Sequence, residues 1–525
     1  MVGTEKLKER FPDLPIGQSC RESVKRVADE NEQFAVLAIK IDDFERLLEL
    51  HGENGITNLI LDIATTIHSL SNETHTIWGR LNRDVFVSLH RSTDEEHALE
   101  LAKKVQSMIS ESGPYTVSIG IAVYPFWPFE KTAVFANAEK ALDHAAFFGP
   151  NTITPFDAVS LNISADKLYQ YGDIDGAIQE LEKARKVDPK NANVNNSLGV
   201  CYGVKGKFLQ AIECFKTAIE LDPEDVMAIY NAGLAYRRLD NREKALRYFI
   251  RAFELDPKNP DISYQTGELY QEKGDEEKAL EFLNKALAIA PQNGKIFRSI
   301  GDCYLLKQMI PEAIDAYKNA VKKDPTDAQS LSTLGHLYGL INENLEIAIR
   351  FCVESISIEP GNGLYHYRLA KLYQKRGELE GALKEFQEAN RLGFECEEKI
   401  KQTEEMIIRE NRYTTLKDAF SGKKSIINYA VKANSNLSVV AHLAKLGAGA
   451  DCVSIGEVNR ALTAGVDKYK IIFSGVGKRD DEIREALGKD ILLLNLESEA
   501  EMKRVEMVAR KLGREARISI RVNPN

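Results

Sequence analysis

The chain has 525 residues, 43% of them hydrophobic and 28% charged, and its formal net charge of −10 disfavours binding to nucleic acids and to anionic membranes. It contains no run of about 18 apolar residues and no apolar signal-peptide core near its N-terminus, and its cysteines form neither a C-x-x-C pair nor a cluster with histidines. We therefore expect a cytoplasmic protein with reduced thiols and no metal site, with room for three or four domains.

The first part of the chain alternates strands and helices. Residues 34–48, FAVLAIKIDDFERLL, predict a strand followed by a helix, and residues 75–90 predict a hairpin. Residues 115–125 predict a further strand, and residues 136–153 close with a helix. This order resembles the diguanylate cyclase family, whose domain is called GGDEF after its turn motif, and the strand TVSIGIA and the last helix carry the best match. The resemblance implies an α+β domain over residues 1–157.

The family's chemistry depends on residues that this sequence replaces. The signature turn falls on residues 82–86, NRDVF, in which Asp84 and Phe86 match and the catalytic acid is Val85. Lys40 stands where the family has a metal-binding aspartate, and Ala146 where it has a phosphate-binding lysine. Leu48 and Thr57 replace the two residues that read guanine. The product-inhibition motif falls on residues 73–76, which do not match it. Two-metal phosphoryl transfer needs carboxylates to hold the metals. We therefore expect no cyclase activity, and a domain that serves in sensing or in forming a homodimer.

Residues 158–396 carry a repeat of 34 residues. Its prolines are Pro189, Pro223, Pro257, Pro291, Pro325 and Pro360, and glycines at 199, 233, 267, 301 and 335 keep the same period. The pattern resembles the tetratricopeptide family and predicts an all-α solenoid of seven repeats, each built of two helices that cross closely at small residues. A one-residue insertion in the sixth repeat, within residues 339–350, is expected in the turn between its helices.

A solenoid of this kind presents a concave groove, so a protein or peptide partner is expected. The candidate contact residues lie on the first helices of the repeats and are Asn196, Tyr230, Asn231, Arg237 and Arg238. The alternative is that these side chains form an ordinary solvated helix face.

The last part of the chain predicts a parallel α/β fold. Residues 397–423 predict a helical linker, and from residue 424 apolar strands alternate with amphipathic helices. The strands are expected at residues 425–431, 450–456, 469–475, 491–497 and 516–523. This spacing suits a TIM-type barrel of which residues 424–525 hold about five of the eight strands.

Lys432 ends the first of these strands. A single lysine there is ordinarily a surface side chain, but YAVKAN at 429–434 is followed in order by LGAGADCVS at 446–454, FSGVGK at 473–478 and RVNP at 521–524. Together these motifs resemble diaminopimelate decarboxylase, a family that uses pyridoxal 5'-phosphate. The resemblance implies that Lys432 is the catalytic lysine that holds the cofactor as an imine, and that Asp451, Glu457 and Arg521 belong to the same site.

Each accompanying residue also has a plain structural interpretation. Asp451 suits a turn, Glu457 suits the N-terminus of a helix, and Arg521 suits an ion pair at the end of a strand. Ile455 stands where the family has a glycine.

The resemblance covers about residues 410–525 and omits the later strands and the second domain of the family. The histidine that stacks on the cofactor, the glycine-rich phosphate loop and the acid on the ring nitrogen have no counterpart, so we expect a truncated barrel that does not decarboxylate meso-diaminopimelate in lysine biosynthesis. Two hypotheses remain. One is an incomplete decarboxylase fused to a tetratricopeptide module, and the other is a noncatalytic protein-binding scaffold with a cyclase-like regulatory domain. The lost motif residues argue against a third, a regulator that responds to cyclic dinucleotides.

Overall fold

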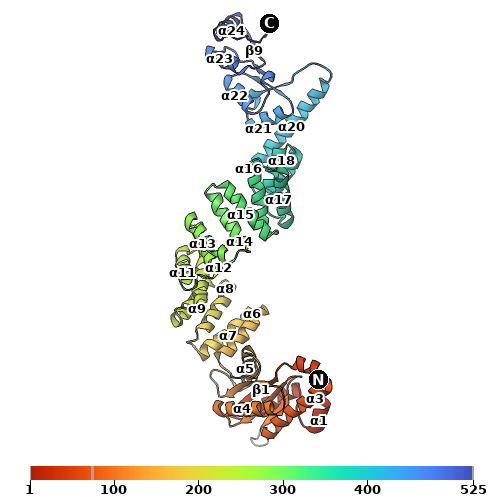
Figure 1. Cartoon of the computed structure of the whole chain (residues 1–525), viewed down its shortest axis with the longest axis vertical. Helices are drawn as coiled ribbons and strands as arrows, with labels where there is room; N and C mark the ends of the chain where they lie inside the picture. The colour runs from red at the N-terminus through yellow and green to blue at the C-terminus, as the bar shows by residue number, and fades with distance from the viewer. Residues whose placement is uncertain (1, 72–75, 523–525) are drawn as a thin grey trace. The chain divides into compact units, whose positions relative to one another are not determined.

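A computed structural model describes residues 2–71 and 76–522 of the chain. The chain divides into two compact units, Met1–Ile289 and Ala290–Asn525. Figure 1 colours the chain from red at the N-terminus to blue at the C-terminus and labels helices and strands where there is room.

The first unit begins with a sheet of five strands. They are β1 (Phe34–Ile41), β2 (Ile77–Arg80), β3 (Val85–Arg91), β4 (Val117–Tyr124) and β5 (Ile153–Pro155). Their order is β2-β3-β1-β4-β5, in which β1 is antiparallel to β3 and β4, and β5 is parallel to β4. The helices around the sheet are α1 (Thr4–Arg10), α2 (Gln18–Glu30), α3 (Phe44–Ser71), α4 (Glu95–Ser112), η1 (Lys131–Ala133) and α5 (Val134–Phe148). The predicted α+β fold of this region, including its hairpin, is confirmed.

Strand β1 is buried on both faces because helices cover both sides of the sheet. Val36 and Ala38 pack in one core with α2 and α5, whereas Leu37 and Ile39 pack in a second core with α3 and α4. A strand enclosed in this way is apolar along almost its whole length, as FAVLAIKI is.

The solenoid consists of helices paired as the 34-residue period predicts. In the first unit the pairs are α6 (Ala158–Gln170) with α7 (Ile174–Val187), α8 (Ala192–Val204) with α9 (Phe208–Leu221), α10 (Val226–Arg238) with α11 (Arg242–Leu255), and α12 (Pro260–Glu272) with α13 (Glu276–Ile289). In the second unit they are α14 (Gly294–Leu306) with α15 (Ile310–Lys323), α16 (Ala328–Leu340) with α17 (Leu345–Ile358), and α18 (Gly363–Arg376) with α19 (Leu379–Arg391). The all-α solenoid is confirmed.

Two repeated features fix each helix pair. The first helix begins at an Asn or Asp two residues after each periodic proline, and this side chain accepts a hydrogen bond from a backbone N–H of the first turn, which stabilises the helix start. The capping residues are Asn191, Asp225, Asn259, Asn293, Asp327 and Asn362. The periodic glycines let the two helices approach each other. A Cβ atom at Gly233, for example, would lie 2.6 Å from Cε1 of Phe249 on the partner helix.

The inserted residue of the sixth repeat lies in the turn between its helices, as predicted. Helix α16 ends at Leu340 and α17 begins at Leu345. Asn342 and Asn344 in this turn adopt left-handed backbone conformations with φ of 58° and 47°. Asparagine tolerates this conformation better than most residues, so the extra residue is accommodated without breaking either helix.

The first core continues from the cyclase-like region into the first repeat. Ala138, Ala141 and Leu142 of α5 belong to the same buried cluster as Leu161 and Leu181 of the first helix pair. An ion pair of 2.7 Å between Lys167 Nζ and Asp143 Oδ1 crosses the same junction, as does one between Lys140 and Glu180. The first repeat therefore buries its open face against α5.

The second unit ends in a parallel sheet that follows the long helix α20 (Glu397–Ala419). Its strands are β6 (Asn428–Ala430), β7 (Gly449–Cys452), β8 (Ile471–Phe473), β9 (Leu493–Leu496) and β10 (Ile518–Ile520), in the order β10-β9-β8-β7-β6. The helices between them are η2 (Val431–Ala433), α21 (Leu437–Lys445), α22 (Ile455–Thr463), η3 (Lys468–Lys470), α23 (Asp480–Lys489) and α24 (Glu499–Leu512). This alternation confirms the predicted α/β region with five parallel strands.

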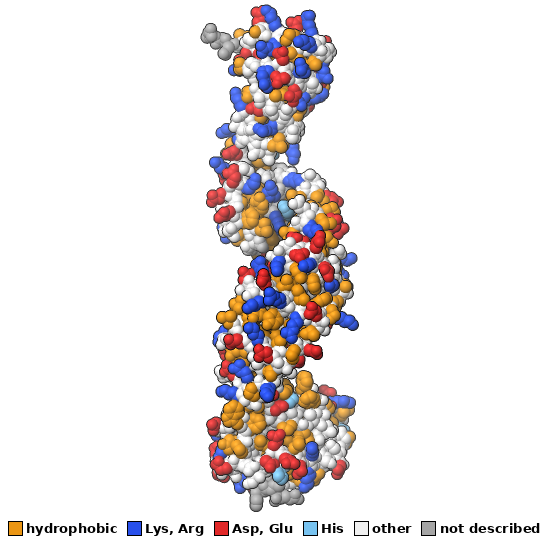
Figure 2. Space-filling model, turned by 90° about the vertical axis from the view of Figure 1, so that its left-hand side faces the viewer, with side chains coloured by type: hydrophobic (Ala, Val, Ile, Leu, Met, Phe, Trp, Pro, Cys, Tyr) orange, Lys and Arg blue, Asp and Glu red, His pale blue; other side chains and the backbone are white. Residues whose placement is uncertain are grey.

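The surface carries charges of both signs. On the face shown in Figure 2, basic and acidic side chains are interspersed, with hydrophobic side chains between them. Among residues 2–71 and 76–522, no helix combines the length and the apolar character needed to cross a bilayer.

Candidate functional site

Lys432 lies just past the carboxyl end of β6, in the short helix η2. Val431 anchors this turn in the core, since its side chain is fully buried, and the next side chain, that of Lys432, is exposed. In the described part of the chain, the Lys432 amine has neither a hydrogen-bond acceptor nor an ion-pair partner. The sequence therefore places an accessible, unpaired amine at the side of the sheet where the parallel strands have their carboxyl ends.

Asp451 lies on the neighbouring strand β7, one residue before its carboxyl end. It is the register partner of Ala430, two residues before Lys432. Its half-buried carboxylate accepts a hydrogen bond from the Ser474 hydroxyl, which follows β8. The sheet thus places Lys432, just after β6, near Asp451 on the adjacent strand β7. Ser474, just after the third strand β8, fixes the position of the Asp451 carboxylate.

Glu457 stands in the first turn of α22. Ser454 caps this helix, and its Oγ accepts a hydrogen bond of 3.2 Å from the Glu457 amide. The Glu457 carboxylate reaches back and accepts a hydrogen bond of 2.8 Å from the Val453 amide. Both bonds satisfy amides at the helix start, so Glu457 fixes the turn that leaves β7.

Arg521 follows β10, at the opposite edge of the sheet from β6. Its guanidinium donates to Glu497 Oε1 over 3.1 Å, and Glu497 follows β9. Neighbouring strands are about 4.8 Å apart, and three strands separate β10 from β6. The structure therefore places Arg521 next to a strand that three others separate from β6 in the sheet order, in an ion pair at a strand end.

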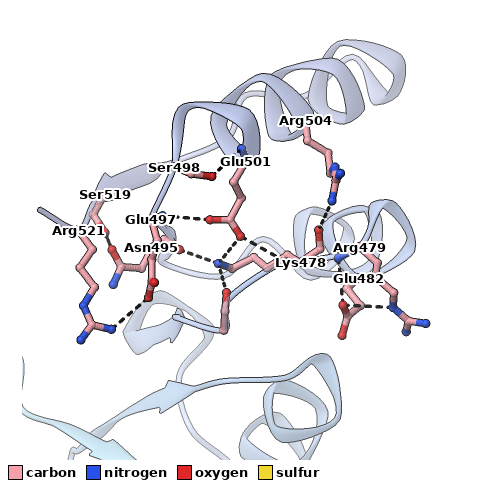
Figure 3. A network of polar contacts seen from close by, with 11 residues as sticks. Lys478, Arg479, Glu482, Asn495, Glu497, Ser498, Glu501, Arg504, Ser519 and Arg521 are labelled. Atoms are coloured by element: carbon pink, nitrogen blue, oxygen red, sulfur yellow. Dashed lines mark hydrogen bonds and ion pairs between the residues drawn. The ribbon is translucent and has the colours of Figure 1, made fainter. Parts of the chain in front are cut away.

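The loop from Ser474 to Lys478 builds a polar centre that sequence reasoning did not assign (Figure 3). Gly475 is required there, because a Cβ atom would lie 2.0 Å from the Val453 carbonyl oxygen. The side chain of Lys478 turns inward and is only 1% exposed. Its Nζ donates to the carbonyl oxygens of Gly475 and Asn495 over 2.5 and 2.6 Å.

Glu501 on α24 completes this centre. Its Oε1 lies 3.2 Å from Lys478 Nζ, and its Oε2 accepts a 3.0 Å hydrogen bond from the Glu497 amide. Burial acts to raise the pKa of Glu501, but the Glu497 amide and the Lys478 charge outweigh it and hold the pKa below its usual value. Figure 3 shows the pair between the β8–α23 loop and the start of α24. The motif FSGVGK was a signal of this loop, but nothing in it reveals that its lysine is buried.

The residues predicted for the solenoid groove mostly contact one another or the next repeat. Asn231 Nδ2 donates to Asn196 Oδ1 over 3.1 Å, and Arg237 pairs with Glu272 on the first helix of the following repeat. Tyr230 packs on Phe249, and burial raises its pKa to about 12. Arg238 is exposed. These contacts link consecutive repeats and set the spacing of their first helices.

The positions that correspond to the cyclase chemistry hold structural contacts. Lys40 and Val85 are register partners on β1 and β3. Asp42, after β1, accepts hydrogen bonds of 2.7 Å from Thr116, Ser118 and the Asn151 amide. Thr57 is buried, whereas Leu48 is half-buried and Ala146 is exposed. The motif at residues 73–76 lies, except for Thr76, outside the described residues. Within residues 2–71 and 76–522, no three His, Cys, Asp or Glu side chains are grouped to hold a metal.

Family models match three parts of the chain. The model described as "Diguanylate cyclase, GGDEF domain" matches residues 16–151. Tetratricopeptide repeat models match residues 165–206, 192–225 and 225–292. The model described as "Pyridoxal-dependent decarboxylase, pyridoxal binding domain" matches residues 407–525. The chain thus joins a GGDEF-like region and tetratricopeptide repeats to a region that is similar to the pyridoxal-binding domain of decarboxylases.

Curated relatives of the last region include diaminopimelate decarboxylases. That of Campylobacter jejuni is 65% identical over 114 residues, which are 22% of this chain and 28% of the relative. A crystal structure of the Helicobacter pylori enzyme complexed with L-lysine is 57% identical and covers 22% of this chain and 29% of that one, with a TM-score of 0.22. A crystal structure of MamA is 33% identical and covers 31% of this chain and 96% of that one, with a TM-score of 0.30. The chain spans 28% of the length of the Campylobacter relative.

Proposed function

We propose that the C-terminal region is a pyridoxal-phosphate-binding module of the diaminopimelate decarboxylase type and that Lys432 carries the cofactor. The observation that supports this proposal most is the exposed, unpaired amine of Lys432 just past the end of β6. An amine attacks an aldehyde in its unprotonated form, which an ion pair with a carboxylate disfavours, so Lys478, buried and paired with Glu501, suits this role less well. The residues present therefore fit the aldehyde end of the cofactor.

The surrounding residues would act through position and charge. Asp451, held by Ser474, places a negative charge on the strand next to Lys432. Glu457 keeps the turn after β7 in place through the Val453 amide. When bound, the cofactor supplies an electron sink for the carbanion that decarboxylation leaves. The names of the relatives associate this type of module with diaminopimelate, and we propose lysine biosynthesis in the cytoplasm as its setting.

We propose further that this chain attaches the cofactor without turning over diaminopimelate. The support is the position of Arg521, which lies across the sheet from Lys432 and pairs with Glu497. A site that stabilises a transition state needs its charged groups held together around the substrate. Lys432 and Asp451 alone do not form such an enclosure.

The test is to mix the purified chain with pyridoxal phosphate, reduce with borohydride and map the adduct by mass spectrometry. We expect selective labelling of Lys432, its loss in Lys432→Ala, and unchanged labelling in Lys424→Ala, which removes an exposed lysine eight positions earlier. Labelling spread over many surface lysines would contradict cofactor binding. Release of carbon dioxide from diaminopimelate that Lys432→Ala abolishes would contradict the absence of turnover.

A second proposed function is a protein-binding scaffold. It is favoured by the contacts between first helices of consecutive repeats, such as Asn196 with Asn231 and Arg237 with Glu272, which hold the groove face in one arrangement before any partner binds. A preorganised surface loses less entropy on binding. A photo-crosslinking residue at position 238 should capture one defined protein from the native host's extract. The same residue at position 216, on the second helix α9, should not, and equal capture at both would contradict the proposal.

A further inference from the structure

A pocket of about 380 Å³ lies within the second unit, and Lys432 is not among its lining residues. Its walls come from α16 and α18, the first helices of the last two repeats, and from α21 of the α/β region, which are labelled in Figure 1. Pockets that bind small molecules usually measure about 300–1,000 Å³. This pocket is therefore large enough for a small ligand.

The charged side chains that line the pocket are all basic. Three lysines, Lys371, Lys375 and Lys445, face it together with His336 and His442, and none of its described lining residues is an aspartate or glutamate. His442 is paired with Glu410 over 3.0 Å.

The three lysines lack acidic partners. Lys375 donates to the Gly339 carbonyl oxygen. Over residues 2–71 and 76–522, neither Lys371 nor Lys445 has an ion pair or a hydrogen bond. By contrast, Arg376 on the same helix as Lys371 and Lys375 is paired with Glu346 and Glu378. The positive charge of the pocket is thus left uncompensated by the protein.

The lowered pKa values of two lining residues are consistent with the positive charge around the pocket. Loss of hydration and then the positive charges of Lys399 and Lys375 lower the pKa of Lys371. Burial, together with Arg368 and Lys371, lowers the pKa of His336 to about 4, so its ring is neutral at pH 7 and can donate a hydrogen bond. A bound anion would relieve the repulsion among these cations.

We propose that this pocket binds a small organic polyanion that carries phosphate or carboxylate groups. Lys371, Lys375 and Lys445 supply the charge, and Ser438, in the first turn of α21, adds a hydroxyl at the positive end of that helix. Leu372 and Met406 form an apolar wall for the carbon skeleton. The proposal does not involve Lys432, so it stands or falls separately from cofactor attachment.

The test is calorimetric titration of the whole chain with pyrophosphate and with citrate, at constant ionic strength in a buffer free of polyvalent anions. We expect saturable binding of at least one probe, and the comparison assigns the site to phosphate or to carboxylate chemistry. The double variant Lys371→Gln/Lys445→Gln should weaken binding by roughly 100-fold, because each lost charge-assisted contact is worth about tenfold or more. Lys384→Gln, which removes an unpaired exposed lysine of α19 outside the pocket, is the matched control and should bind like the parent chain.

A second measurement needs no variant. Acetylation of the native chain followed by mass spectrometry should show that the probe protects Lys371 but not Lys384. In the Lys432→Ala variant, the probe should protect Lys371 from acetylation to the same extent, because the pocket does not depend on Lys432. Absence of saturable binding below about 10 mM, equal weakening in the control variant, or equal protection of both lysines would overturn the proposal.

Discussion

Lys478 Nζ lies 3.2 Å from Glu501 Oε1, and the two side chains are only 1% and 6% exposed. Both charges are satisfied by further contacts with backbone groups, so the pair joins the loop after β8 to the start of α24. A buried pair of this kind contributes little compared with apolar packing, but removing one partner leaves a buried charge.

Replacing Lys478 with Met should therefore destabilise the C-terminal region by about 3–5 kcal/mol. Hydrogen exchange of peptides from residues 471–512, measured in increasing urea, reports this region within the whole chain. Lys503→Met is the matched control on α24, because its pair with Glu499 is 71% and 73% exposed and should contribute less than about 1 kcal/mol. Equal effects of the two substitutions would contradict the role of the buried pair.

The lowered pKa of Glu501 also predicts a pH dependence. Its contribution to stability should be complete above the unfolded-state pKa of about 4.3 and should be lost as the pH falls through the lower pKa of the folded state. Glu501→Gln should remove this acid-dependent loss in the same exchange measurement. A variant whose stability falls as steeply as that of the parent chain below pH 4.3 would contradict it.

Substitutions at two glycines should have opposite effects. Gly233→Ala should destabilise the solenoid by about 1–3 kcal/mol, because the new Cβ atom meets the buried ring of Phe249. Gly203→Ala, in helix α8 with open space around the Cβ position, should stabilise it by about 0.5–1 kcal/mol through helix propensity. Thermal unfolding followed by circular dichroism distinguishes the two. A stabilising Gly233→Ala would show that the helices do not pack as closely as the structure indicates.

His90 should make the N-terminal region sensitive to acid. Its side chain is buried and burial lowers its pKa to about 4, so below the unfolded-state pKa of about 6.5 the unfolded chain binds a proton that the folded chain excludes. Stability should fall by up to about 3 kcal/mol between pH 6.5 and 4. The two tryptophans, Trp78 and Trp127, report unfolding of this region by fluorescence. His90→Gln should flatten the dependence and His51→Gln, at an exposed position, should leave it unchanged.

The GGDEF-like region should form no cyclic dinucleotide from GTP and magnesium. The position of the metal-binding aspartate holds Lys40, which is paired in register with Val85 at the position of the catalytic acid. Asp42, the nearby carboxylate, already accepts three hydrogen bonds that join β1 to β4 and to the turn before β5. Chromatography with mass detection, with an active cyclase run in parallel, checks this expectation. Product above the magnesium-free background would contradict it.

Periodic and local features were predictable from the sequence. The 34-residue period of prolines and glycines predicts the helix pairs, and the caps at Asn191, Asp225 and their equivalents follow each proline at a fixed distance. The position of Lys432 at a strand end follows from the apolar run before it. These properties depend on residues close together in the chain.

The remaining features arise from contacts between distant residues. Nothing near Lys478 indicates burial, because its partner Glu501 lies 23 positions away on another helix. The separation of Lys432 from Arg521 depends on the strand order, and the lysine pocket depends on the packing of α21 against two repeats. The roles of Lys432, Asp451, Glu457 and Arg521 in a cofactor site stay predictions.

Helix α20 has a consequence for how this protein can be divided. Ile400, in its first half, packs on the last repeat, whereas Met406 and Tyr413 pack with Val439 and Leu443 of α21. The match to the pyridoxal-binding family begins at residue 407, in the middle of this helix. A fragment cut at the family border would lose Met406 and leave half a helix without its natural start. The boundary of the family match therefore does not coincide with a structural boundary of the folded chain. A fragment that contains the α/β region should begin at Glu397, where α20 starts.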